Sequence, residues 1–180
     1  MRGIIAFFMI LGMGGLAVHG CASTVGAGGG GVTERVIRAE PAQIVEAMNR
    51  SLSADGMEVV SRSDSGDYYR LAMTEAEMRS NPQFGRLADQ GAVVFNAHVT
   101  QAKIEFTANF DSGLVSGFTI DMSPTTDGTL ARVSPVIRNN GQAPNEAMMA
   151  ALSRNFGRYG ERTLETIADA AESDRSRPVL

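Results

Sequence analysis

The sequence predicts an α+β domain in which an antiparallel meander sheet packs against a long C-terminal helix. Two observations indicate this fold class. Between residues 93 and 138, apolar and polar residues alternate over several short segments, which is typical of antiparallel strands with one buried face. After residue 144, apolar residues recur at steps of three and four up to Ala171, which is typical of an amphipathic helix.

Composition indicates one domain. The chain has 180 residues and a net charge of −4, and about 140 residues remain after the N-terminal segment described below, which is one domain by length. A mildly acidic body is a poor candidate for nucleic-acid binding, because that function needs a dense basic surface. Cys21 is the only cysteine, so no intramolecular disulfide can form.

Residues 1–20 have the organisation of an export signal. Arg2 supplies a positive charge, and residues 4–18 are almost wholly apolar. This length is typical of a signal peptide and short for a membrane span, which needs about 20 residues. The segment ends in Val18-His19-Gly20-Cys21, which resembles the lipobox of bacterial lipoproteins. The resemblance implies cleavage before Cys21, a diacylglyceryl thioether on its sulfur, and an acyl group such as palmitate on its new amino group.

The residues around the lipobox bear on sorting. Ala22 rather than Asp follows the cysteine, which resembles lipoproteins sorted to the outer membrane. We therefore expect the mature chain on the inner leaflet of the outer membrane, facing the periplasm, held stably because two or more acyl chains anchor far better than one. His19 occupies a position that is usually small, and an ordinary signal peptide cleaved after Ala22 is the alternative.

Residues 21–31 are expected to form a lipidated cysteine followed by a flexible tether. Residues 22–31 are mostly glycine and other small residues, and a chain of this kind has an end-to-end distance of roughly 17 Å. Gly26, Gly28 and Gly31 also match the spacing of a dinucleotide fingerprint. That motif needs a strand before it and a helix after it, and neither is predicted here, so we favour the tether.

The first half of the body, from residue 32, alternates strands and helices. A short strand is predicted over residues 32–39, and Pro41 then begins a helix that ends at Asp55-Gly56, since proline suits the first helical turn and glycine the C-terminal cap. Residues 57–62 and 68–73 are strand-like. Thr74 and Glu77 have the spacing of a capping box, which predicts short helical turns over residues 74–90.

The second half holds the meander and the long helix. Strands are predicted over 93–99, 104–110, 114–122 and 130–138, with Pro135 indicating an edge or a bulge in the last. The helix contains Gly157 and Gly160, which permit close packing or a bend. The domain is expected to span residues 32–172, with a loose tail at 173–180. This order resembles a helix-grip fold, and in element order alone the accessory lipoproteins of the outer-membrane barrel-assembly machinery.

No motif for catalysis, a metal or a cofactor is recognisable. His98 lies on the polar row of a predicted strand without ligand spacing, so a surface role is favoured over a metal site or a Ser–His–Asp triad. Asp64 and Asp67 flank a predicted turn and lack the ligand density of a calcium loop. We therefore expect that the chain is not an enzyme and binds no cofactor other than its covalent lipid.

One surface feature indicates a contact. Arg154, Arg158 and Arg162 recur every four residues of the long helix, so they stack along one side of it. Such an arginine stripe could contact acidic lipid headgroups or an acidic partner, since the tether keeps the domain near the bilayer. A solvated face with ion pairs to Glu161 and Glu165 is the alternative.

Two functions remain open. The first is a membrane-anchored, non-catalytic binding or scaffold module of the cell envelope, with another envelope protein as its partner. The second is a carrier or sensor of an apolar ligand held between the sheet and the long helix. The residues expected to line such a cavity are Phe95, Phe106, Phe110 and Phe156.

Overall fold

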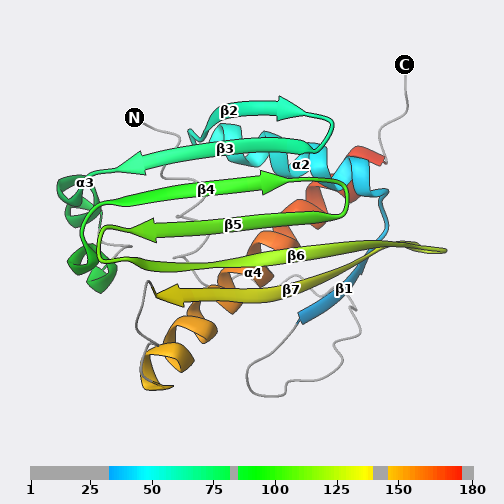
Figure 1. Cartoon of the computed structure of the whole chain (residues 1–180). Coiled ribbons are helices and arrows are strands. Elements are labelled where there is room, and N and C mark those ends of the chain that lie inside the picture. The colour runs from blue at the N-terminus through cyan, green and yellow to red at the C-terminus, as the bar shows by residue number, and fades with distance from the viewer. Residues whose placement is uncertain (1–32, 82–84, 140–145, 176–180) are drawn as a thin grey trace.

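A single antiparallel sheet covered by helices on one face makes up the fold (Figure 1). The computed structural model describes residues 33–81, 85–139 and 146–175. The predicted signal peptide, Cys21, the tether and residues 176–180 lie outside the described residues. The elements in chain order are β1 Thr33–Ile37, α2 Pro41–Ala54, β2 Glu58–Ser63, β3 Gly66–Met73, α3 Glu75–Ser80, the 3-10 helix η1 Gly85–Gln90, β4 Val93–Val99, β5 Lys103–Phe110, β6 Leu114–Thr125, β7 Gly128–Asn139 and α4 Glu146–Arg175.

The predicted meander is confirmed. The seven strands follow the order β1-β7-β6-β5-β4-β3-β2, so β2 to β7 are neighbours in chain order and β1 adds to the far edge beside β7. In β4 and β5 every second residue is buried, because the pleat sends alternate side chains to opposite faces. Gly113 has a positive φ of 85°, which suits glycine in the turn between β5 and β6.

The last hairpin is longer than the sequence pattern predicts. β6 and β7 stay paired out to Thr125 and Gly128, although apolar alternation stops earlier. Pro135 lies in β7 opposite Phe118, and the described residues of β1 pair with residues 129–133 of that strand. Within the part of the chain that the structure describes, Pro135 therefore lies at a local edge of the sheet, as the proline predicted.

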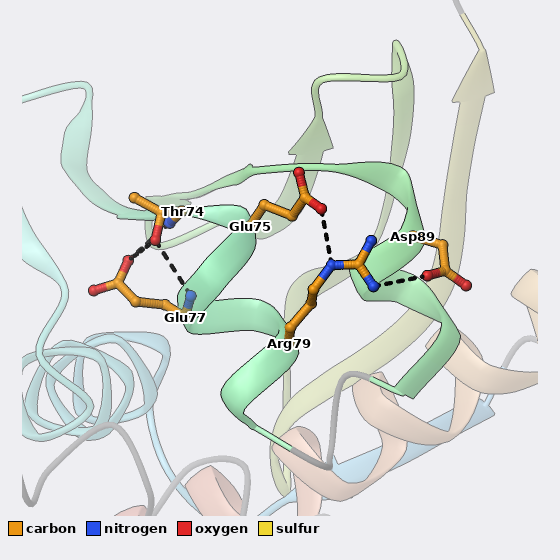
Figure 2. A network of polar contacts seen from close by, with 5 residues as sticks. All are labelled: Thr74, Glu75, Glu77, Arg79 and Asp89. Carbon is orange, nitrogen blue, oxygen red and sulfur yellow. Dashed lines mark hydrogen bonds and ion pairs between the residues drawn. The ribbon is translucent and has the colours of Figure 1, made fainter.

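Local signals define the two short helices. Pro41 occupies the first turn of α2, and Gly56 follows its end with a φ of 83°. The capping box of α3 is confirmed: Thr74 Oγ1 accepts from the Glu77 amide, and the Glu77 carboxylate accepts from the Thr74 amide. Figure 2 shows this cap beside Arg79, which joins Glu75 to Asp89 of η1. These contacts keep α3 and η1 together at one end of the sheet.

Helix α4 crosses the concave side of the sheet diagonally and packs on β6, β7, β1 and α2 (Figure 1). Its buried face carries Leu164, Ile167, Ala168 and Ala171. It runs to Arg175, three residues beyond the predicted domain boundary at residue 172. Among the helices of the described residues, none is both long and apolar enough to cross a membrane.

Gly160 lies close against the sheet. A Cβ atom there would clash with Val133 Cγ1 and would lie 3.1 Å from the Phe118 ring. A Cβ atom at Gly157, nearly one turn earlier, would have no neighbour within 4 Å. Close packing therefore requires glycine at position 160 and not at position 157.

Candidate apolar binding site

The concave face of the sheet is built from side chains in rows across the strands. One row joins Leu71, Phe95, Ala108, Ser116 and Ile137 through successive strand pairs. Ala108 and Ser116 are the smallest side chains of this row and lie directly opposite each other. The row therefore has larger apolar side chains at both ends and small side chains at its centre.

Aromatic rings surround that centre. Phe95 stacks on Phe106 with ring centroids 5.9 Å apart, and Phe106 stacks on Phe118 at 5.5 Å. Such pairs stabilise a core by about 0.5–1.5 kcal/mol beyond their burial. We name the four rings Phe95, Phe106, Phe110 and Phe118, with Ala108 and Ser116, the aromatic face.

Burial differs along the concave side. Phe95, Phe106 and Phe110 keep 5%, 6% and 6% of their surface accessible, whereas Ile104 and Ile120 keep none. The isoleucines belong to the row farther from the β5–β6 turn, where the sheet is fully covered. All of these side chains are buried and belong to one core cluster, in which Phe118 keeps 1% and Met122 keeps 5% of its surface accessible. The fourth predicted lining residue, Phe156, lies outside the described side chains.

Ser116 is the polar group of the aromatic face. It is fully buried, and its Oγ has no hydrogen-bond partner among the described residues. A buried hydroxyl without a partner costs about 1–3 kcal/mol. The sequence pattern places Ser116 in the apolar row of β6 but does not show that its hydroxyl is unpaired. A lone polar residue within an apolar alternation is the signal that could have drawn attention to it.

A second buried polar group lies between α2 and β3. Tyr69 is almost fully buried, and its Oη has no partner within hydrogen-bonding geometry in the described part of the chain. Burial raises the pKa of the Tyr69 phenol above its ordinary value; the Asp67 carboxylate adds to this, and Arg62 opposes it. Asn49 Nδ2 donates to Asp67 Oδ2 at 2.9 Å. No sequence pattern indicates this cluster, because it depends on the packing of α2 onto the sheet.

The candidate residues for chemistry lie elsewhere. His98 is on the opposite, convex face, where it stacks on Tyr68 with centroids 3.9 Å apart. Its Nε2 lies 3.2 Å from the Ser65 carbonyl oxygen. Asp64 is exposed in the β2–β3 turn. Within the described ranges, no group of three or more histidine, cysteine or acidic side chains is placed to hold a metal ion.

The arginine stripe is exposed on α4, as predicted: all three side chains face solvent. Of the two glutamates expected beside the stripe, Glu161 accepts a hydrogen bond from Thr33 Oγ1 of β1, and Glu165 is exposed. Cys21, the predicted lipidation site, lies outside the described residues.

Comparison with known proteins identifies the fold. No protein-family model and no curated protein matches the sequence. Among solved structures, the chain is similar to a protein from Thermus thermophilus, with a TM-score of 0.51 and 14% identity over 81% of this chain and 98% of that one. It is also similar to the di-domain aromatase/cyclase StfQ of the steffimycin biosynthetic pathway, with a TM-score of 0.55 and 10% identity over 81% of this chain and 52% of that one. This is a helix-grip fold. The predicted fold class is confirmed.

The same comparison corrects one prediction. From the absence of a recognisable motif we expected that the chain is not an enzyme. An aromatase/cyclase has the same fold, so the helix-grip architecture is compatible with catalysis. The missing motif is therefore no ground for excluding an enzyme, and the similarity, at 10% identity, bears on the fold alone.

Proposed function

We propose that this domain binds an apolar molecule between the concave face of the sheet and α4, and that a lipidated Cys21 holds it at a membrane facing the periplasm. The observation that carries the proposal is the aromatic face: stacked, buried rings around a buried hydroxyl that has no partner among the described residues. Ligand sites of this kind are mostly apolar, with a few polar groups that orient the ligand.

The chemistry of the face indicates the class of ligand. The rings offer dispersion contacts and no charge, so they favour an apolar chain or ring system. Ser116 can donate or accept one hydrogen bond, and a ligand with one hydroxyl or carbonyl would satisfy it. A charged group would be disfavoured there, because an ion buried without a counter-charge is costly.

The lipobox supports the membrane part of the proposal. A domain tethered by a short glycine-rich segment would stay close to the bilayer, which is also where apolar molecules concentrate. The fold is compatible with ligand carriage, since one helix closes over one face of the sheet. Lipidation itself is tested by the intact mass of membrane-extracted protein, which should exceed that of the cleaved chain by its acyl groups and lose them in Cys21→Ala.

Ligand binding is tested by extraction. Full-length protein would be purified from membranes, extracted with organic solvent, and the extract analysed by mass spectrometry against Ala108→Leu and Thr107→Leu. Ala108 belongs to the aromatic face, whereas Thr107 is its neighbour on the convex face. We expect one apolar molecule per protein in the wild type and in Thr107→Leu, and its loss in Ala108→Leu.

The wild-type extract alone decides the matter if Ala108→Leu fails to fold, as circular dichroism would show. An extract without a stoichiometric apolar molecule contradicts the proposal. Equal amounts in folded Ala108→Leu and in the wild type would place the ligand away from the aromatic face and contradict it as well.

A further inference from the structure

The exposed side of α4 divides its charges by position. The arginine stripe (Arg154, Arg158 and Arg162) recurs once per turn over about 12 Å of the helix, and each side chain is exposed. Like charges four residues apart on a helix repel one another by a few tenths of a kcal/mol, so the stripe is a local cost to the folded chain.

Three acidic residues of the same helix contact β1 or the residue that follows it. Glu161 accepts from the Thr33 hydroxyl, Asp169 Oδ1 lies 3.6 Å from Arg35 Nη2, and Glu172 Oε1 accepts from the Arg38 amide at 2.9 Å. These contacts lie along the second half of α4. These acidic side chains thus join α4 to the β1 edge, whereas Glu165, three positions after Arg162, is exposed beside the stripe.

The contact between Thr33 and Glu161 also fixes where the N-terminal segment meets the domain. Glu161 is adjacent to Arg162 in the helix and less than one turn from Arg158. Thr33 follows Cys21 by twelve positions, a chain length that spans roughly 19 Å on average when glycine-rich. A lipid on Cys21 would therefore hold the bilayer surface near the stripe.

We propose that the arginine stripe docks on the anionic phospholipid surface of the membrane in which Cys21 is anchored. This rests on the lipidation in the proposed function and adds to it a defined orientation, with α4 toward the bilayer. Each arginine near an anionic surface strengthens binding about fivefold. The exposed Glu165 on the same side offsets one of the three charges, so the docked orientation would be favoured about 25-fold. Screening by salt weakens such contacts, because the Debye length is only about 8 Å at physiological ionic strength.

The test uses the lipidated full-length chain in vesicles and a reporter thiol. Cys21 is the only natural cysteine, and its sulfur is blocked by the lipid, so Gly157→Cys introduces one reactive thiol beside the stripe, at a position with open space. Ser61→Cys provides the matched control on β2, at the opposite edge of the sheet from β1. A fluorophore on either thiol is quenched by a quencher attached to lipid headgroups.

In vesicles containing phosphatidylglycerol we expect stronger quenching at position 157 than at position 61. Quenching at position 157 should fall to the value at position 61 in high salt, in phosphatidylcholine vesicles, or after all three stripe arginines are changed to glutamine. A charge-matched variant with Arg50, Arg62 and Arg70 changed to glutamine should behave like the wild type. Equal quenching at both positions, or quenching unchanged by removal of the stripe, overturns the docking.

The failures of the two proposals are distinguishable. A chain that carries no acyl mass and does not stay with the vesicles refutes the lipid anchor. A chain that is acylated and stays with the vesicles, yet shows no stripe-dependent quenching, refutes the docking alone. The stripe could also cross-link to an acidic envelope protein while quenching shows no dependence on phosphatidylglycerol. That result would overturn docking on the membrane in favour of a protein partner.

Discussion

Replacing Ser116 by alanine should stabilise the domain and weaken ligand binding at the same time. The Ser116 Oγ is buried with no partner among the described residues, which costs about 1–3 kcal/mol. Alanine removes this cost and loses the contacts of only one oxygen atom. We expect a net gain of about 1 kcal/mol in the free energy of unfolding, or a rise of about 2–4 °C in Tm for a chain of this size.

The effect on binding has the opposite sign. A ligand group that pairs with Ser116 would lose a hydrogen bond in a buried site, which weakens affinity about tenfold. Thermal melts of the full-length protein measure the first effect, and dose-dependent photolabelling by a diazirine-bearing fatty alcohol measures the second. Ser123→Ala, at an exposed position of the same strand, is the control and should change stability by less than about 0.5 kcal/mol. A Ser116→Ala protein that melts below the wild type and labels equally would refute the reasoning.

Three further predictions concern packing and titration. Gly160→Ala should lower Tm because its Cβ clashes with Val133, an overpacking cost of about 1–3 kcal/mol. Gly157→Ala should instead raise the free energy of unfolding by about 1 kcal/mol through helix propensity. Equal shifts of Tm in the two variants would contradict the close packing at position 160. Burial raises the pKa of Tyr69 in the folded protein, so the stability that this residue contributes is present below pH 10.0 and is lost as the pH rises through the raised pKa. Tyr69→Phe should therefore flatten the alkaline limb of a curve of stability against pH. Hydrogen bonds from the amide and hydroxyl of Thr74 lower the pKa of Glu77. The stability that Glu77 contributes is therefore present above pH 4.5 and is lost as the pH falls through the lowered pKa. Glu77→Gln should reduce the loss of stability at acid pH, and an unchanged acid limb of the curve would argue against the cap.

Local patterns predicted most of the architecture. The alternation in residues 93–110 identifies two strands and their buried faces because a pleated strand has a strict period of two. Pro41 and the Thr74–Glu77 pair mark helix starts by satisfying or removing amides at the first turn. Each of these signals acts over a few residues, and this is why a single sequence carries it.

Properties that depend on distant parts of the chain were not predictable in the same way. The pairing of β1 with β7 joins Thr33 to Val133, and no local pattern specifies such a partner. The contact between Thr33 and Glu161 depends on that pairing, so the spacing of residues within α4 could not indicate it. The unpaired hydroxyl of Ser116 likewise depends on what surrounds it in three dimensions. The aromatic face was predicted in part, through Phe95, Phe106 and Phe110, since inward alternation places these rings on one face.

Locating the bound ligand in the full-length protein tests most directly whether the domain holds an apolar molecule. Cells expressing the chain would be irradiated with the diazirine-bearing fatty alcohol, and the labelled peptides of the purified protein mapped by mass spectrometry. We expect labels in β4, β5 and β6 at residues of the aromatic face, competed by an excess of unreactive fatty alcohol. Labels confined to the convex face around His98, or labelling that the competitor does not reduce, would contradict binding of an apolar molecule between the sheet and the C-terminal helix.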